Sequence, residues 1–259
     1  MPINQLVNKQ LVNVLIKFDF FNFRNIFNRY LNDWNLYFCT LKFKKIMHFI
    51  SEDLENYVAK HSQQEPELLV QLNKETHQKI LQPRMLSGHF QGRVLSMLSK
   101  IINPNAILEI GTYTGYAALC LAEGLQENGT LDTIDINEEL EEIQKKYFDL
   151  SEYSNQIVQH IGDAIEIIPT LNKKFDLVFI DADKENYINY FHLIVPFMNK
   201  GGIILSDNVL WSGKVLEEVK TNDKSTQILL DYNKIINEDS RVETVLFPIR
   251  DGLTVTRVL

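Results

Sequence analysis

The chain alternates between short apolar runs and amphipathic segments over most of its length. Seven runs rich in Val, Ile, Leu and Phe have the length of strands, and turn residues bound most of them. Between these runs, apolar residues recur at helical spacing. We predict strands at 106–110, 131–136, 157–161, 175–181, 202–206, 242–248 and 253–258, with helices at 117–127, 138–151, 163–171, 187–198 and 225–238.

Strands that alternate with helices predict an α/β fold in which helices cover both faces of a mostly parallel sheet. The last two predicted strands are joined only by residues 249–252, too few for a crossover helix, so they should pair antiparallel. Three more helices are expected before the first strand, one beginning at Ser51 and two at 66–80 and 91–102. The sequence thus predicts a seven-stranded, Rossmann-like sheet with an antiparallel C-terminal strand pair.

The first 46 residues differ from the rest in composition, with no Gly, Ala, Ser or Glu but seven Phe and eight Asn. Residues 1–46 carry seven Lys and Arg against two Asp, a net charge of +5, whereas residues 47–259 carry 19 against 32 acids, a net charge of −13. We predict an atypical extension at 1–46 and a globular domain at 47–259. Residues of AT-rich codons dominate the extension, which favours translation from a start upstream of Met47. An amphipathic surface helix and a disordered tail are the alternatives.

Charge and cysteine content limit the partners and the compartment. The net charge of −8 argues against broad attraction to nucleic acid or to an anionic membrane. No run approaches the roughly 18 apolar residues of a membrane-spanning helix, so no membrane association is expected. Cys39 and Cys120 are the only cysteines, and they form neither a disulfide framework nor a zinc pair. A cytoplasmic protein is expected.

One apolar run breaks at Gly111, turns through Gly115 and resumes as a helical pattern. Glycines let a backbone approach a ligand closely, and the N-terminus of a helix favours negative charge. Ligands of open α/β sheets bind outside the carboxyl ends of the strands. The candidate site residues are therefore the polar groups at these ends, which are Glu109, Gly111, Asp135, Gly162 to Ala164, Asp181 to Lys184, Asp207 and Asn208.

The cofactor can be narrowed from the turn and from Asp135, which lies about 20 residues after it. An acid at this point can accept hydrogen bonds from ribose hydroxyls. The turn has neither the spacing of a dinucleotide-binding loop nor the Gly-Lys-Ser/Thr of a P-loop. A cofactor with a ribose but no phosphate is favoured, and S-adenosylmethionine fits, with Asp163 and Ala164 at the edge of its adenine.

Four blocks of the sequence resemble the cation-dependent O-methyltransferase family, which includes the catechol and caffeoyl-coenzyme A O-methyltransferases. The blocks are residues 107–116, 133–136, 179–187 and 206–208. They occur in the order and spacing of the family, and segments 83–89 and 208–213 are most similar to its uncharacterised bacterial branch. The resemblance implies a Rossmann-like methyltransferase fold and, because dimers are usual in the family, a homodimer.

The resemblance also implies roles for individual residues. Glu109 and Gly111 would shape the methionine end of S-adenosylmethionine, and Asp135 would bind its ribose. Ala117 departs from the family pattern, since many members have a Ser there whose hydroxyl helps to hold the methionine carboxylate. We expect this departure to cost about one hydrogen bond, or ~1 kcal/mol. The implied cofactor-binding set is Met85, Ser87, Glu109, Gly111, Tyr113, Ala117, Asp135, Asp163, Ala164 and Asp181.

Asp181, Asp207 and Asn208 offer two carboxylates and an amide oxygen at strand ends, a set that suits Mg²⁺ better than zinc. In the family these positions bind the divalent cation. A phenol has a pKa near 10, and chelation by a cation makes its deprotonation far easier. Lys184, which matches the lysine of catechol-type members, would accept that proton, so Lys184 and Asp181 are the predicted catalytic residues. Trp211 is expected either to cover a flat substrate or to belong to the core.

The leading hypothesis is an enzyme that depends on S-adenosylmethionine and a divalent metal, and methylates vicinal hydroxyls of a small aromatic. The alternative within the family is methylation of a hydroxylated wobble uridine in tRNA. The charge of residues 47–259 argues against tRNA, although a basic rim could still guide RNA, made of Lys173, Lys174, Lys184, Lys214 and Arg250. A nicotinamide-dependent oxidoreductase is disfavoured, because the dinucleotide glycine is missing and the metal set is present.

Overall fold

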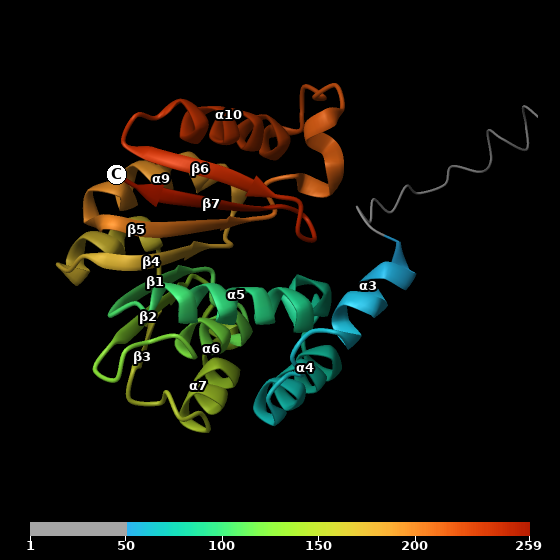
Figure 1. Ribbon diagram of the computed structural model, residues 1–259, viewed down its shortest axis with the longest axis vertical. Helices are drawn as coiled ribbons and strands as arrows, with labels where there is room; N and C mark the ends of the chain where they lie inside the picture. The colour runs from blue at the N-terminus through green and yellow to red at the C-terminus, as the bar shows by residue number, and fades with distance from the viewer. Residues whose placement is uncertain (1–50) are drawn as a thin grey trace, which may run out of the picture. The chain divides into compact units, whose positions relative to one another are not determined.

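A seven-stranded sheet with the strand order β3-β2-β1-β4-β5-β7-β6 forms the centre of the protein (Figure 1). The strands are β1 Ala106–Ile110, β2 Thr130–Asp135, β3 Ile157–Ile161, β4 Phe175–Ile180, β5 Met198–Asp207, β6 Val242–Phe247 and β7 Leu253–Val258. β7 runs antiparallel to both of its neighbours, β5 and β6, and every other pair is parallel. The predicted mostly parallel α/β sheet with an antiparallel C-terminal pair is therefore confirmed.

The computed structural model describes residues 51–259, which belong to the compact unit Met47–Leu259. The predictions for residues 1–46 lie outside the described residues. The α-helices are α3 Glu52–Lys60, α4 Glu67–Lys79, α5 Gly88–Ile102, α6 Tyr116–Ala122, α7 Glu141–Asp149, α8 Ala164–Ile167, α9 Tyr187–Ile194 and α10 Lys224–Glu238. Short 3₁₀ helices are η1 Pro83–Met85, η2 Glu138–Leu140, η3 Ile168–Leu171, η4 Lys184–Asn186, η5 Val195–Phe197 and η6 Trp211–Leu216. Within 51–259, no helix is long and apolar enough to cross a membrane.

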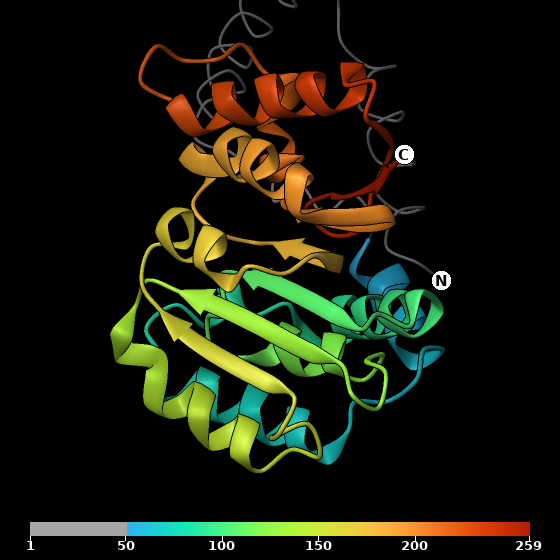
Figure 2. The same cartoon turned by 90° about the vertical axis from the view of Figure 1, so that its left-hand side faces the viewer.

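Helices cover both faces of the sheet and define two apolar cores (Figures 1 and 2). One core joins α4, α5, α6 and α7 to the first face, and the other joins α8, α9 and α10 to the opposite face. β1 is buried along its entire length because it lies in the middle of the sheet between both layers. The carboxyl end of this strand is therefore a rigid position from which to present a ligand site.

Two element boundaries differ from the sequence prediction at glycine. α6 ends at Ala122 rather than at residue 127, because Gly124 lies against α5, where a Cβ would come within 2.2 Å of the Ser99 backbone. β5 begins at Met198 instead of 202, since the strand continues through Gly201 and Gly202 with an irregular register. Glycine thus marks a close approach in one place and a strand irregularity in the other.

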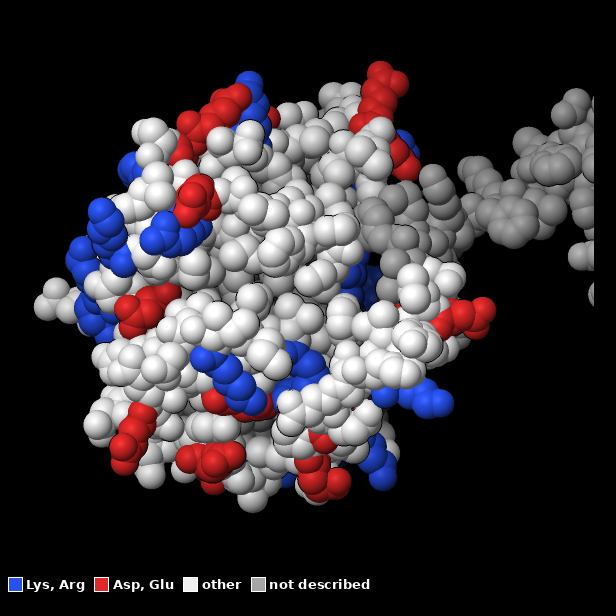
Figure 3. Space-filling model, viewed as in Figure 1, with Lys and Arg blue, Asp and Glu red and all other residues white. Residues whose placement is uncertain are grey.

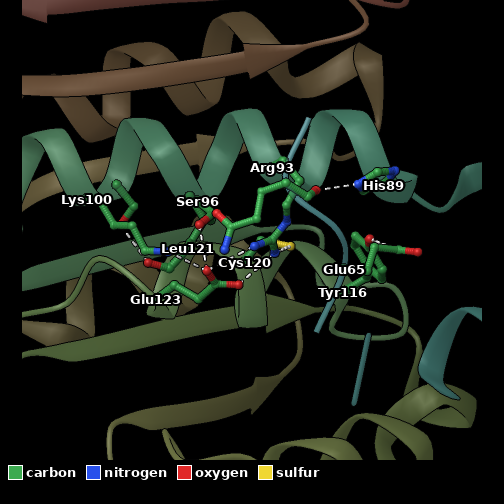
Figure 4. A network of polar contacts seen from close by, with 11 residues as sticks. Glu65, His89, Arg93, Ser96, Lys100, Tyr116, Cys120, Leu121 and Glu123 are labelled. Carbon is green, nitrogen blue, oxygen red and sulfur yellow. Dashed lines mark hydrogen bonds and ion pairs between the residues drawn. The ribbon is translucent and has the colours of Figure 1, made fainter. Parts of the chain in front are cut away.

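A partly buried network of charges links α5 to Glu123 at the end of α6 (Figure 4). Arg93 of α5 is buried, and its Nη2 lies 2.6 Å from Oε1 of Glu123. The Ser96 hydroxyl and the Lys100 ammonium each donate to Oε2 of Glu123, at 2.7 Å. A buried charge without partners would be strongly destabilising, so these contacts fix how the two helices pack.

Candidate active site

The carboxyl ends of β1 and β4 meet at Gly111. This glycine has φ +98°, and a Cβ on it would lie only 2.0 Å from the carbonyl oxygen of Asp181. A side chain is therefore excluded on steric grounds, and the backbone conformation itself favours glycine. The N–H of Asp181 donates to Ile110 O at 2.9 Å, which secures the approach. Gly111 thus brings the predicted cofactor turn and the predicted metal strand into contact.

A cleft opens beside this contact. Six residues of the predicted cofactor set share it, and its lining is Met85, Leu86, Ser87, Gly111, Thr112, Tyr113, Tyr116, Ala117, Phe179 and Asp181. Glu109 and Asp135, near the ends of β1 and β2, are outside this lining, as are Asp163 and Ala164. The latter two follow β3, where the Asp163 carboxylate accepts a hydrogen bond from Ile165 N at 2.8 Å. The Asp163 carboxylate thus caps α8, and its place at the adenine stays a prediction.

Glu109 lies fully buried at the end of β1. One carboxyl oxygen, Oε2, accepts a hydrogen bond from the Thr133 hydroxyl, whereas Oε1 has no hydrogen-bond partner within residues 51–259. Burial raises the pKa of Glu109 well above its usual range, the Thr133 contact lowers it, and the charges of Asp135 and Asp181 raise it further. A buried oxygen without a partner is costly, so this atom fits a ligand that brings a donor.

Asp135 is anchored at the end of β2 by two backbone amides. Tyr113 N donates to Oδ2 at 2.7 Å, and Asn137 N donates to Oδ1 at 2.8 Å. Burial nevertheless raises the pKa of this carboxyl. Each carboxylate oxygen can accept a second hydrogen bond, so Asp135 keeps acceptor capacity for a pair of hydroxyls.

Asp181 and Asp207 lie side by side, because the β4–β5 register pairs Ile180 with Ser206. Asp207 is buried, and desolvation together with the charge of Asp181 raises its pKa to about 7. Asn208 follows at φ 58°, and its N–H donates to Oδ1 of Asp207 at 2.8 Å. Two acids and one amide form this set, and residues 51–259 contain no group of three or more His, Cys, Asp and Glu that could hold a metal ion.

Lys184 is buried beside this pair, not exposed as a solvated surface lysine would be. Its Nζ lies 3.3 Å from Oδ1 of Asp181 and donates a hydrogen bond to the hydroxyl of Tyr187. That hydroxyl in turn donates to the backbone oxygen of Asp207 at 2.9 Å. The ammonium group is therefore held beside the Asp181 carboxylate and is linked through Tyr187 to the backbone of Asp207.

Trp211 borders the site from the segment after Asn208. Its ring centroid lies 5.9 Å from Nζ of Lys184 and 5.6 Å from Nζ of Lys214. The side chain is also partly buried against the core beneath α9 and α10. Trp211 therefore packs on the core, as one of the two expectations has it, and the role of covering a flat substrate stays a prediction.

Gln91 and the β6–β7 turn were missed by the sequence interpretation as parts of the site. Gln91 is buried at the start of α5, and its Nε2 donates to Oδ2 of Asp207 at 2.6 Å. Its Oε1 accepts a hydrogen bond from Nη1 of Arg250 at 2.9 Å. A polar residue on the buried side of a predicted helix was the only local signal, because these partners lie 116 and 159 residues away in the chain.

Comparisons with known proteins agree on one family. The profile of a family described as O-methyltransferase matches residues 59–259. Caffeoyl-CoA O-methyltransferase 1 from Arabidopsis thaliana is 31% identical over 220 residues, which cover 80% of this chain and 85% of that protein. The SAH-bound methyltransferase PaMTH1 from Podospora anserina has a TM-score of 0.74 at 26% identity, covering 80% of this chain and 94% of that one. The O-methyltransferase TomG from Streptomyces achromogenes, in complex with SAM, has a TM-score of 0.73 at 26% identity, covering 81% and 99%.

Proposed function

We propose that this chain, which belongs to the O-methyltransferase family and transfers methyl groups from S-adenosylmethionine, is a divalent-metal-dependent enzyme for vicinal hydroxyls of a small, catechol-like aromatic. One observation carries the proposal. Lys184, Asp181 and Asp207 are adjacent at the ends of β4 and β5, and Asp181 also lines the cleft. A base, a cation site and a cofactor cleft that share one carboxylate are what metal-assisted methyl transfer to a hydroxyl requires.

Residues at the ends of β1 and β2 support the choice of S-adenosylmethionine as the cofactor. The partnerless oxygen of Glu109 suits the cationic amino group of the methionine part, and the free acceptor capacity of Asp135 suits the ribose. Gly111 leaves the backbone open between them. Ala117 lines the cleft with a methyl group, so the methionine carboxylate must be bound by backbone amides or water instead of a side-chain hydroxyl.

The oxygen atoms of Asp181, Asp207 and Asn208 support the proposed dependence on a divalent cation. Asp181, Asp207 and Asn208 would bind the cation, most suitably Mg²⁺, through oxygen atoms. The pKa of Asp207 is raised because burial and the neighbouring Asp181 carboxylate both disfavour its charged form. A bound cation would stabilise the two carboxylates in their charged forms. When bound, the cation makes a chelated hydroxyl more acidic.

In this proposal Lys184 acts as the neutral amine, which a cation bound nearby favours over the ammonium, and it takes the proton of the reacting hydroxyl. Asp181 and Tyr187 hold Nζ of Lys184 in place from two sides. The Trp211 ring, whose centroid lies 5.9 Å from this Nζ, offers an aromatic surface to a flat acceptor. Once the hydroxyl has lost its proton, its oxygen has only to be aligned with the methyl group of S-adenosylmethionine for transfer to occur.

The acceptor class is tested by methyl transfer from labelled S-adenosylmethionine to catechol, caffeate and hypomodified tRNA. We expect methylation of catechol or caffeate and none of the tRNA, in accordance with the acidic charge of residues 47–259. If the tRNA were methylated and catechol and caffeate were not, the result would instead establish the wobble-uridine alternative. If neither the phenols nor the tRNA were methylated, the proposed acceptors would be contradicted.

We also infer a homodimer, supported by apolar side chains that remain exposed on one face. Met97 and Ile101 of α5 are exposed, as is Val245 of β6, which pairs with Val255 on the face that α5 partly covers. Figure 3 shows an area without charged side chains above α5 on this side. Light scattering after gel filtration should give twice the chain mass, and a monomer at micromolar concentration would contradict the dimer.

A further inference from the structure

The turn between β6 and β7 is bonded to the segment that lines the cofactor cleft. Nη1 of Arg250 donates to the carbonyl oxygen of Leu86 at 3.3 Å and to the carbonyl oxygen of Ser87. It also donates to Oε1 of Gln91 at 2.9 Å. Gly88, which directly follows Ser87, has φ +74°, a backbone conformation that favours glycine. Two carbonyls and one amide thus accept from a single charged group, and such bonds are stronger than neutral ones.

The same turn is bonded to the segment that follows the metal ligands. Leu210 N donates to the carbonyl oxygen of Asp251 at 2.9 Å, and Val209 N donates to that of Gly252 at 3.3 Å. Gly252 has φ +90°, and a Cβ there would lie 2.5 Å from Cγ of Leu210. The close approach therefore depends on glycine at this position.

Gln91 connects the two sides through the interior. Because its Oε1 accepts from Arg250, its Nε2 is left to donate to Asp207, at 2.6 Å. Gln91 and Asp207 are both buried, so water does not compete for either bond. An amide has one acceptor side and one donor side, so Arg250 determines which side of Gln91 meets the carboxylate.

We propose that Arg250 and Gln91 are positioning residues that hold the cofactor-lining segment and the metal ligand Asp207 in a fixed relation to each other. Arg250 acts on both the cofactor cleft and the proposed metal site. It donates directly to the carbonyl oxygens of Leu86 and Ser87, and it contacts Asp207 through Gln91. Gln91 acts on Asp207 alone. The role at Asp207 rests on the proposed metal dependence, whereas the role at the cleft does not.

Two binding measurements on the full chain separate these roles. S-adenosylhomocysteine affinity is measured by calorimetry in chelator, and Mn²⁺ affinity by electron paramagnetic resonance of the free ion. The variants are Arg250→Met, Gln91→Met and the matched control Arg257→Met. Arg257 lies on β7 and has its ion pair with Glu243 at the surface. Melting temperatures for each variant show that binding is measured on folded protein.

Arg250→Met should raise both dissociation constants about tenfold, whereas Gln91→Met should raise only that of Mn²⁺, by about fivefold. Arg257→Met should change neither by more than about twofold. A purely structural role would lower the melting temperature without this selective pattern. If Arg250→Met does not fold, Arg250→Lys is used in its place, and it must weaken the binding of both S-adenosylhomocysteine and Mn²⁺.

Wild-type affinity for both ligands in Arg250→Met would overturn the inference while leaving the proposed function intact. Wild-type Mn²⁺ affinity in Gln91→Met would overturn the link to Asp207. A wild-type protein that binds S-adenosylhomocysteine but no Mn²⁺ would overturn the metal dependence, and with it the role assigned to Gln91.

Discussion

Ala117 lies in the first turn of α6, on the wall of the cofactor cleft. Its methyl group forms no hydrogen bond, although the resemblance to the family implies a methionine carboxylate nearby. Ala117→Ser should lower the dissociation constant of S-adenosylmethionine about fivefold, which corresponds to ~1 kcal/mol for one hydrogen bond. Calorimetry measures this directly, and an unchanged or weaker affinity would contradict a carboxylate at this position.

Lys184 is the residue that the proposed proton transfer requires. Lys184→Met keeps the length of the side chain but removes the base, so kcat for a catechol probe should fall by about 10²–10⁴-fold. Binding of S-adenosylhomocysteine should change little, because Lys184 is outside the lining of the cleft. The matched control is Lys145→Met on α7, an exposed lysine paired with Asp149. A kcat within about threefold of wild type for Lys184→Met would rule out the general-base role.

At the scale of elements, the site depends on the approach of β1 to β4. Gly111→Ala would place a Cβ 2.0 Å from the Asp181 carbonyl, so the strand ends must separate. We expect a loss of several kcal/mol of stability, at the upper end of what single substitutions cost, and weaker cofactor binding. Gly201→Ala is the control, because its φ is also positive (+82°) but its nearest neighbour is a side-chain atom 3.8 Å away. Equal unfolding free energies for the two variants, from denaturant titration, would contradict this account of Gly111.

The sequence predicts those elements whose signals are local. The seven strands and the acids at their ends follow from apolar runs and from the residues that bound them. Gly201 and Gly202 misled the prediction of β5, because the same residues that end a strand are tolerated within an irregular one. The contacts of Gln91 and Arg250 have no local signature, since tertiary packing alone brings α5 and the β6–β7 turn together. Long-range contacts of this kind require the structure.

At the scale of the whole molecule, four acids that are wholly or partly buried around the site should make the stability of the fold depend on pH. Burial raises the pKa values of Glu109, Asp135 and Asp251, and that of Asp207 to about 7. An acid with a raised pKa in the folded state stabilises the fold below its unfolded pKa of about 4, and this contribution is lost as pH rises through the folded pKa. The metal-free protein should therefore be more stable near pH 5 than near pH 8.

Denaturant titrations in chelator across this range test the dependence, and Asp207→Asn is the comparison. The variant cannot ionise at residue 207, so its stability should decline less with pH than that of the wild type. Stability that increases from about pH 5 to about pH 8 in the wild-type protein would contradict the raised pKa values.

The dependence of methyl transfer on a divalent cation is the central claim about the molecule. Turnover of a catechol probe is measured with S-adenosylmethionine in EDTA, and again after excess Mg²⁺ is added. We predict that EDTA abolishes turnover and that Mg²⁺ restores it, because Asp181, Asp207 and Asn208 provide the oxygen ligands beside Lys184. Full activity in the chelator would contradict a metal-dependent mechanism.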